Sequence, residues 1–236
     1  MVFATKQGII KKTRLDAYKN QRSAGVRAIN INDGDEVVGV RLTNGHNELL
    51  LANRNGRAVR FDENDVRTMG RVSTGVIGMR LDGGDDEVVG MVCVNDPQTE
   101  TIMVVSENGY GKRSEVEDYR KTARGAKGVK TLNITEKTGR LVAIKVVTDE
   151  NDLMIINKSG VLIRLKVADV RVMGRATQGV RLINLTKKND SIASVCKVMS
   201  NQEEDVEEAE VLQDEEVIEG DAPENEAPLV DFAPEE

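Results

Sequence analysis

Residues 45–61 read GHNELLLANRNGRAVRF, and this segment indicates the architecture of the whole chain. Two β-prone runs flank Asn55-Gly56, a pair that supplies the positive φ angles of a tight two-residue hairpin turn. Asn108-Gly109 repeats this turn signal, whereas Gln7-Gly8 and Ser159-Gly160 keep the glycine alone. The segment therefore predicts a β-hairpin, and the other glycines predict that the hairpin recurs along the chain.

The hairpin recurs at intervals of about fifty residues. Successive hairpin glycines are 48, 53 and 51 residues apart, and a second glycine follows each of them by 17 to 19 residues. Strand-rich repeats with periods of forty to fifty residues are typical of radially arranged β-blades. The turn glycines are Gly8, Gly25, Gly56, Gly75, Gly109, Gly128, Gly160 and Gly179.

Each copy contains enough β-prone sequence for four strands. After the hairpin, a polar connection leads to the second glycine and then to an apolar run, namely residues 26–31, 76–81, 129–134 or 180–185. A further turn rich in Gly, Asp or Asn leads to the next apolar run. We therefore expect an all-β array of about four four-stranded antiparallel blades over residues 1–200, with copies at 1–43, 44–95, 96–148 and 149–200.

The composition excludes several classes of protein. The 236 residues are 39% hydrophobic and 31% charged, which is typical of a soluble globular chain. No run of eighteen apolar residues and no export signal is present, so we expect a cytoplasmic protein without a membrane partner. Two cysteines, Cys93 and Cys196, and a single histidine, His46, leave little material for a metal site or for catalysis. Both cysteines lie in apolar runs and are expected to be buried.

The charge is unevenly distributed along the chain. Residues 201–236 contain sixteen Asp and Glu and neither Lys nor Arg, so we expect a disordered acidic tail. The net charge of −7 therefore conceals a basic body, in which Lys and Arg outnumber Asp and Glu by nine. A basic body with an acidic tail is typical of a nucleic-acid binder whose tail competes with DNA, and a solubilising tail is the alternative.

Basic residues recur with the repeat and form three sets. Radial blades display equivalent positions around one rim, so the recurrence predicts a curved cationic track. The fourth-position cations, four residues after each hairpin glycine, are Lys12, Arg60, Arg113 and Arg164. The eleventh-position cations are Lys19, Arg67, Arg120 and Arg171, and the connection cations, which precede the second glycine, are Arg22, Arg71, Arg124 and Arg175.

The third copy adds Lys112 to the expected DNA-binding residues, and its densest basic stretch, at residues 120–130, adds Lys121, Lys127 and Lys130. With three Tyr, three Phe and no Trp, the chain lacks aromatics for stacking on bases. Such a rim suits duplex DNA that is held through its phosphates and bent. The alternative is that the recurring cations pair with recurring aspartates such as Asp65 and Asp118 and hold the blades together.

The segments GRAVRFDENDVRTMGRVSTGV (residues 56–76), GVLIRLKVADVRVMGRATQGV (residues 160–180) and NGYGKRSEVEDY (residues 108–119) resemble the family of C-terminal domains of DNA gyrase A subunits. The resemblance implies a β-pinwheel, a relative of the propeller in which neighbouring blades exchange an outer strand and duplex DNA wraps around the basic rim. It also implies that the chain contains the last four of six blades and that Met1 is a mid-chain residue.

The resemblance further implies a DNA-binding part that is not itself catalytic. In this family the DNA-breaking tyrosine lies in the N-terminal part of the gyrase A polypeptide, and ATP is hydrolysed, with Mg²⁺, by gyrase B. We therefore expect no cofactor on this chain, and as partners duplex DNA and the remainder of an A2B2 type II topoisomerase that supercoils DNA negatively at the nucleoid. The Gln-Arg-Arg-Gly-Gly-Lys-Gly motif of the family's first blade is missing. The A-type subunit of topoisomerase IV and a propeller-like protein-interaction scaffold remain as alternatives.

Overall fold

The computed structural model describes residues 1–20, 23–185 and 190–200. Within it, Met1–Ser200 forms one compact unit. Two expectations lie outside the described residues, namely the disordered, competing tail at 201–236 and the connection cation Arg22. No helix in the described ranges is both long enough and apolar enough to span a membrane.

The described chain is built from strands, with one short 3-10 helix in each copy. The first copy contributes β1 (Val2–Thr5), β2 (Ile9–Lys12) and β3 (Val37–Arg41), with η1 (Leu15–Tyr18). The second contributes β4 (Glu48–Asn53), β5 (Arg57–Asp62), β6 (Val76–Ile77) and β7 (Val88–Val94), with η2 (Glu63–Asp65). The third contributes β8 (Thr101–Ser106), β9 (Tyr110–Glu115), β10 (Val129–Lys130) and β11 (Leu141–Val147), with η3 (Val116–Asp118). The fourth contributes β12 (Asn151–Asn157), β13 (Leu162–Lys166), β14 (Val180–Arg181) and β15 (Ile192–Met199), with η4 (Val167–Asp169).

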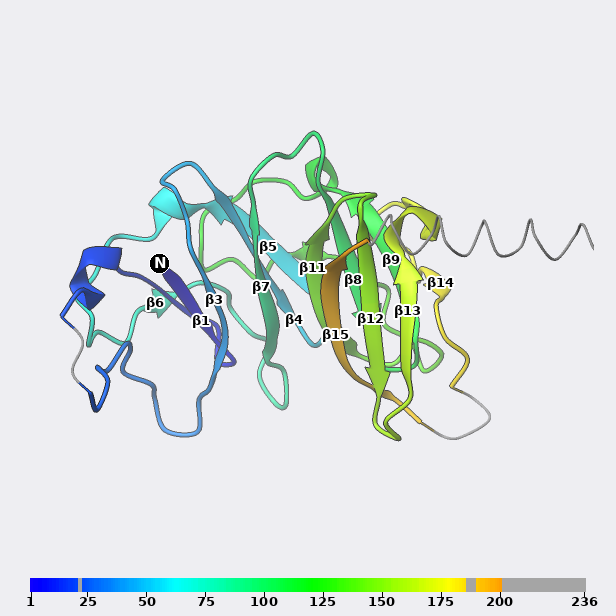
Figure 1. The fold of residues 1–236 in the computed structure, drawn as a ribbon, viewed down its shortest axis with the longest axis horizontal. Helices are drawn as coiled ribbons and strands as arrows, with labels where there is room; N and C mark the ends of the chain where they lie inside the picture. Colours follow the sequence, from blue (N-terminus) through cyan, green and yellow to red (C-terminus); the bar gives the residue numbers. More distant parts are fainter. Residues whose placement is uncertain (21–22, 186–189, 201–236) are drawn as a thin grey trace, which may run out of the picture. The chain divides into compact units, whose positions relative to one another are not determined.

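Three of the four sheets are completed by a strand from the next copy. The hydrogen-bonded orders are β3-β1-β2-β6, β10-β5-β4-β7, β11-β8-β9-β14 and β13-β12-β15. Strands β6, β10 and β14 therefore pair antiparallel with the hairpin strands β2, β5 and β9 of the preceding copy. Figure 1 shows the sheets following one another in chain order. The predicted all-β array of blades is confirmed, and so is the exchange of an outer strand that the resemblance implied.

Two details differ from the sequence prediction. The runs expected at 76–81, 129–134 and 180–185 form strands of only two residues. Residues 26–31 form no strand, and the last sheet has three strands instead of four. The second difference follows from the exchange. The described residues contain no hairpin before the first copy to receive residues 26–31, and no copy after the fourth to complete its sheet.

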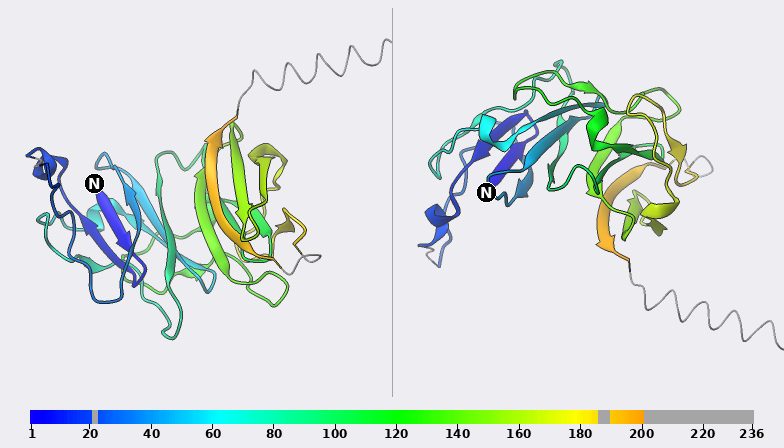
Figure 2. Two further views of the ribbon diagram at one scale, coloured as in Figure 1. Left: turned by 60° about the horizontal axis from the view of Figure 1, so that its bottom comes forward. Right: turned by 90° about the horizontal axis from the view of Figure 1, so that it is seen from above.

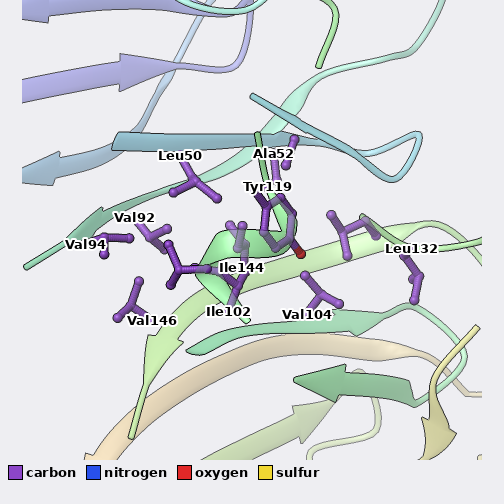
Figure 3. Packing of buried hydrophobic residues seen from close by; sticks show 13 residues of the cluster. Leu50, Ala52, Val92, Val94, Ile102, Val104, Tyr119, Leu132, Ile144 and Val146 are labelled. Atoms are coloured by element: carbon purple, nitrogen blue, oxygen red, sulfur yellow. The ribbon is translucent and has the colours of Figure 1, made fainter. Parts of the chain in front are cut away.

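The apolar cores lie between consecutive blades. In β4, Leu49 faces the cluster shared with the first blade, whereas Leu50 faces the cluster shared with the third. Successive strand residues point to opposite faces, so a blade with a neighbour on each side buries both faces. Figure 3 shows the cluster between the second and third blades, in which Leu50 and Val104 lie close to the buried ring of Tyr119.

Strands β3, β7, β11 and β15 come from successive blades and lie next to one another, as the two views in Figure 2 show. They contribute to a cavity of about 480 Å³ whose wall includes Arg41, Lys145, Lys197 and both cysteines. The prediction of two buried cysteines is therefore wrong for Cys196, which is exposed, while Cys93 is half-buried. Each of these strands turns one face toward a polar cavity, so an apolar strand residue there is not enclosed by a core.

Candidate nucleic-acid interface

The hairpin glycines form the joints between copies. The carbonyl of Gly56 accepts hydrogen bonds from the amides of Thr131 at 2.8 Å and Leu132 at 3.2 Å, both in the next copy. Gly56 has a φ of +75°, and a methyl group on it would lie 2.8 Å from the Leu132 carbonyl oxygen. A side chain would therefore strain the turn and collide with the donated segment. Gly8 and Gly109 accept the same pair of amides from the copies that follow them.

The fourth-position cation Arg60 lies inside a joint between blades. Its side chain is 5% exposed, and its guanidinium donates to the backbone carbonyls of Val116 at 2.8 Å and Tyr119 at 3.0 Å in the next copy. It also pairs with Glu48 on β4 and with Glu117 in η3. Burial opposes the guanidinium charge, but the hydrogen bonds to Glu117 and Glu48 outweigh it and raise the pKa of Arg60. Little of this side chain remains for a phosphate.

Two further fourth-position cations repeat this arrangement. Arg113 donates to the Val170 carbonyl at 2.7 Å in the next copy, and the Lys12 ammonium donates to the Glu63 carbonyl at 2.8 Å. In the last copy, Arg164 is partly exposed and pairs with Asp152 in its own blade at 2.7 Å. The alternative derived from the sequence, that these cations hold blades together, thus describes Lys12, Arg60 and Arg113. Their acceptors are mainly backbone carbonyls, not the recurring aspartates.

Lys112 is also buried, although the sequence placed it among the DNA-binding residues. Its ammonium has no exposed surface and donates to the Gly174 carbonyl at 2.6 Å and the Ser114 hydroxyl at 3.4 Å. Burial lowers the pKa of Lys112 to about 8. A phosphate cannot reach a fully buried ammonium, so the structure removes Lys112 from the exposed basic set.

The connection cations bind the preceding copy but stay at the surface. Arg124 donates to the carbonyls of Asp65 at 2.9 Å and Ile77 at 3.0 Å. Arg175 donates to the equivalent carbonyls of Asp118 and Lys130. Arg71, Arg124 and Arg175 are all half-buried, so part of each guanidinium still faces solvent. These residues connect blades and display charge at the same time.

The side chains of the eleventh-position cations have no partner among the described residues. Each follows the 3-10 helix of its copy within two residues, and Figure 1 shows these helices succeeding one another in blade order from left to right. All four side chains are exposed, and none makes a hydrogen bond or ion pair within the described ranges. These residues are Lys19, Arg67, Arg120 and Arg171.

The remaining third-copy cations are exposed and weakly paired. Lys121 bridges Glu48 at 2.9 Å and Asp62 at 3.3 Å, and its hydrogen bond to Glu48 raises the pKa of Lys121. Lys127, which is 64% exposed, pairs with Asp82 at 2.6 Å. Exposed ion pairs contribute only about 0–1 kcal/mol, so such a lysine can exchange its carboxylate for a phosphate. Lys130 is exposed in the donated strand β10.

The sequence analysis missed two exposed cations that lie just after the second glycine of their copies. Arg27 and Arg181 occupy the same place as Lys130, two residues after the second glycine, and both are exposed. Arg181 also lies over the ring of Tyr110, with its guanidinium carbon 5.5 Å from the ring centre. The missed signal was the recurrence of a basic residue at this place in three of four copies.

Comparison with known proteins agrees with this architecture. The family model for the DNA gyrase C-terminal domain, beta-propeller, matches residues 1–44, 47–95, 100–148 and 151–196. The chain belongs to this family. The DNA gyrase A protein of Staphylococcus aureus strain NCTC 8325 is 44% identical over 210 residues, which are 89% of this chain and 23% of the relative. The gyrase A protein of strain MRSA252 is 44% identical over 208 residues, or 88% and 23%. This chain thus spans about a quarter of the length of these gyrase relatives.

Solved structures share the fold of this gyrase-family chain. The C-terminal domain of DNA topoisomerase IV superposes with a TM-score of 0.79 at 30% identity, over 90% of this chain and 66% of that one. The DNA gyrase A C-terminal domain superposes with a TM-score of 0.74 at 28% identity, over 84% and 65%. The resemblance found in the repeated segments is confirmed. The chain is a gyrase A C-terminal β-pinwheel domain, related to that of topoisomerase IV.

Proposed function

We propose that this domain binds duplex DNA along the rim that carries the eleventh-position cations. The observation that carries the proposal is the set of four exposed and unpaired basic side chains, one at the equivalent place in each blade. Their charge is not neutralised by any described residue, and phosphates are the natural counter-charge for a regular cationic series. Phosphate contacts position DNA without reading its sequence.

The proposed contact surface extends from these four residues to their exposed neighbours. The connection cations and the third-copy lysines contribute charge beside the eleventh-position set, and the residues on donated segments continue it. Three fourth-position cations, Lys12, Arg60 and Arg113, connect the blades that carry this surface. The proposed DNA-binding residues are Lys19, Arg67, Arg71, Arg120, Lys121, Arg124, Lys127, Lys130, Arg171 and Arg175, together with Arg27 and Arg181.

The salt dependence of duplex affinity tests this function. A protein that neutralises Z phosphates shows a log-log slope of about −0.9Z, so four contacts give a slope of about −3.6. We expect at least this slope when the affinity of the chain for a labelled duplex is measured by fluorescence anisotropy at several salt concentrations. A second duplex of scrambled sequence should bind equally well, because the contacts are with phosphates.

A slope shallower than about −1 would contradict the proposal, since fewer than two phosphates would then be neutralised. In that case the protein-interaction scaffold would be the better description of the domain. Strong preference for one of the two duplexes would contradict the phosphate-based mode of binding.

We further propose that the domain serves a gyrase, as a non-catalytic DNA-wrapping part of an A2B2 type II topoisomerase that introduces negative supercoils with ATP. Support comes from the DNA gyrase A relatives, of which this chain matches about a quarter. The proposed partners are gyrase B and the N-terminal part of gyrase A, and the breakage tyrosine and the ATPase lie in those partners.

A chimera tests the gyrase assignment. Residues 1–200 would replace the matching region of the S. aureus gyrase A protein, and supercoiling by the reconstituted holoenzyme would be followed on agarose gels. We expect ATP-dependent negative supercoiling to be retained. Relaxation without supercoiling would favour the topoisomerase IV alternative, provided that the parental S. aureus enzyme supercoils in parallel.

A further inference from the structure

The cavity of about 480 Å³ beside β3, β7, β11 and β15 lies at one level of these four edge strands. In the ladders, the residues that pair with Arg41, Val92, Lys145 and Cys196 each lie six positions before the hairpin glycine of their copy. These four wall residues therefore occupy equivalent places in successive blades. We call this space the inner cavity; its wall consists of Arg41, Leu42, Val92, Cys93, Asn95, Glu100, Lys145, Val146, Cys196 and Lys197.

The four strands carry charge only at the level of the inner cavity. Their sequences are VVGVR, VVGMVCV, LVAIKVV and IASVCKVM, which are otherwise apolar or contain small residues. Three residues in these strands are charged, and all three are cations that line the inner cavity, namely Arg41, Lys145 and Lys197. The level of the cavity is thus the one place where these strands depart from the composition expected beside a core.

The three cations have no carboxylate partner among the described residues. Arg41 donates to the carbonyl of its neighbour Val40 at 2.8 Å. No hydrogen bond or ion pair joins the side chain of Lys145 or Lys197 to a residue that the structure describes. Strand β3 contacts β7, and β11 contacts β15, so the cations come from strands that the array brings side by side.

The charges in the wall of the inner cavity act on one another. Lys145 is half-buried, and its burial lowers its pKa, which the nearby charges of Arg41 and Lys197 lower further. Glu100 is the one carboxylate among the wall residues, and it accepts the backbone and side-chain amides of Asn95 at 2.7 and 3.3 Å. Three cations therefore face the cavity against one carboxylate that amides already engage.

We propose that the inner cavity binds a short inorganic oligophosphate. The guanidinium of Arg41 offers a fork of donors to phosphate oxygens, and the ammonium groups of Lys145 and Lys197 act as point charges. The cations come from three different strands, so phosphate groups in a row reach more of them than a single phosphate does. The volume of about 480 Å³ lies within the range of roughly 300–1,000 Å³ that is typical of ligand pockets.

The composition and the position of the wall define the ligand further. None of the described wall residues is aromatic, so a nucleoside attached to the phosphates would find no ring on which to stack. Lys130, in the donated strand β10, lies at the opposite edge of the sheet from β7, three strand spacings or about 14 Å away. The inner cavity is therefore separate from the proposed DNA contact, and binding there needs no DNA.

Isothermal titration calorimetry of the full 236-residue chain with inorganic triphosphate tests the proposal. We expect saturable binding at about 0.15 M salt, at which contacts between exposed charges are largely screened. Lys145→Gln and Lys197→Gln should each weaken this binding by about tenfold or more, because each removes a charge-assisted contact. Lys197 is exposed, so its replacement keeps the test valid if Lys145→Gln does not fold. A wild-type chain that does not bind triphosphate, or a Lys197→Gln chain that binds it as tightly as the wild type, would overturn the proposal.

An exposed lysine of the same blade is the matched control. Lys158 directly follows β12, is exposed, and belongs neither to the wall of the inner cavity nor to the proposed DNA-binding residues. Lys158→Gln removes the same charge from the chain as Lys197→Gln and should bind triphosphate as the wild type does. Equal losses for these two variants would show that triphosphate responds to overall charge, which would overturn the assignment to the cavity.

The cysteines give a second measurement that needs no variant. Cys93 and Cys196 are the two cysteines of the chain, and both line the inner cavity. Burial raises the pKa of Cys93 to about 11, so the exposed Cys196 should react first with N-ethylmaleimide. Saturating triphosphate should slow the alkylation of Cys196 severalfold, as measured by peptide mass spectrometry. An unchanged rate at saturation would mean that triphosphate binds elsewhere and would overturn the proposal.

A titration with ATP distinguishes a free oligophosphate from the phosphate chain of a nucleotide. ATP carries three linked phosphates together with a ribose and a base, for which the wall residues offer no aromatic side chain. We expect ATP to bind no more tightly than inorganic triphosphate. Binding of ATP that is about tenfold tighter would overturn the assignment to a free oligophosphate.

Discussion

Arg60 and Arg67 carry the same charge seven residues apart in one copy, yet the structure uses them oppositely. Arg60 is buried and holds two carbonyls of the next blade, whereas Arg67 is exposed and has no described partner. The same contrast separates Lys12 and Arg113 from Lys19 and Arg120. Recurrence along the sequence therefore marks positions that the architecture needs, but it does not separate cations that hold blades from cations that face solvent.

Neutralising the exposed set should give the largest effect. The quadruple variant Lys19→Gln, Arg67→Gln, Arg120→Gln and Arg171→Gln is expected to lose about 10³-fold in duplex affinity at about 0.1 M salt, with a log-log slope shallower by about 3.6. Anisotropy titrations measure both quantities. An unchanged slope would remove the functional distinction between the exposed and buried sets.

Removing a buried cation should lower the free energy of unfolding. Arg60→Ala removes the hydrogen bonds that the guanidinium donates to the Val116 and Tyr119 carbonyls and the buried half of the Glu48 pairing, so the free energy of unfolding should fall by about 3 kcal/mol. Urea denaturation followed by circular dichroism measures this loss. Arg67→Ala in the same copy is the matched control and should change stability by less than about 0.5 kcal/mol. Equal losses for the two variants would contradict the contrast.

The buried Lys112 predicts a pH dependence that exposed lysines do not share. Its pKa falls from 10.5 to about 8 on folding, so between these values the unfolded chain binds a proton that the folded chain has lost. Wild-type stability should therefore rise with pH in this window relative to Lys112→Met, by up to about 1.4 kcal/mol per pH unit. Below pH 8 the difference should be constant. Urea titrations at several pH values check this, and a difference that stays flat up to about pH 10 would show that Lys112 is not buried.

The weakly paired Lys127 should give the smallest effect on stability. Lys127→Gln removes its exposed pair with Asp82 and should cost less than about 0.5 kcal/mol of unfolding free energy. If Lys127 contacts a phosphate, the salt slope of duplex binding should become shallower by about 0.9. A large loss of stability would place Lys127 with the buried cations instead.

Local sequence was sufficient to predict the blades. Asn55-Gly56 and Asn108-Gly109 specify hairpins through backbone conformation alone, and the fifty-residue period supplies the array. The exchange of outer strands, unlike the hairpins, could not be predicted from local sequence. In it, Arg57 pairs with Lys130, which lies more than seventy residues later in the chain. No local signal encodes such a pairing, and the resemblance to a known family was the source of that expectation. Residues 26–31 were predicted wrongly for the same reason, because a strand there depends on pairing with a distant hairpin.

The recurrence of the cations could be predicted from the sequence, but not which of them the fold buries. The recurring cations were found, yet the burial of Arg60 depends on carbonyls of Val116 and Tyr119 that the next blade presents. Alternation along β5 places Arg60 on one face, but which residues approach that face is a property of the fold. Lys112 was misjudged for the same reason, since its enclosure comes from Gly174 in another copy.

Because blades exchange an outer strand, a sheet can be completed during translation only after the following copy has been synthesised. The hairpin strand β5 is synthesised well before its outer partner, because Arg57 pairs with Lys130 of the following copy. At about 5–20 residues per second, each nascent sheet stays incomplete for several seconds while the following copy emerges. Each of the first three blades thus exposes an open edge to other nascent chains and to chaperones during translation, and the chain closes these edges one at a time from its N-terminus.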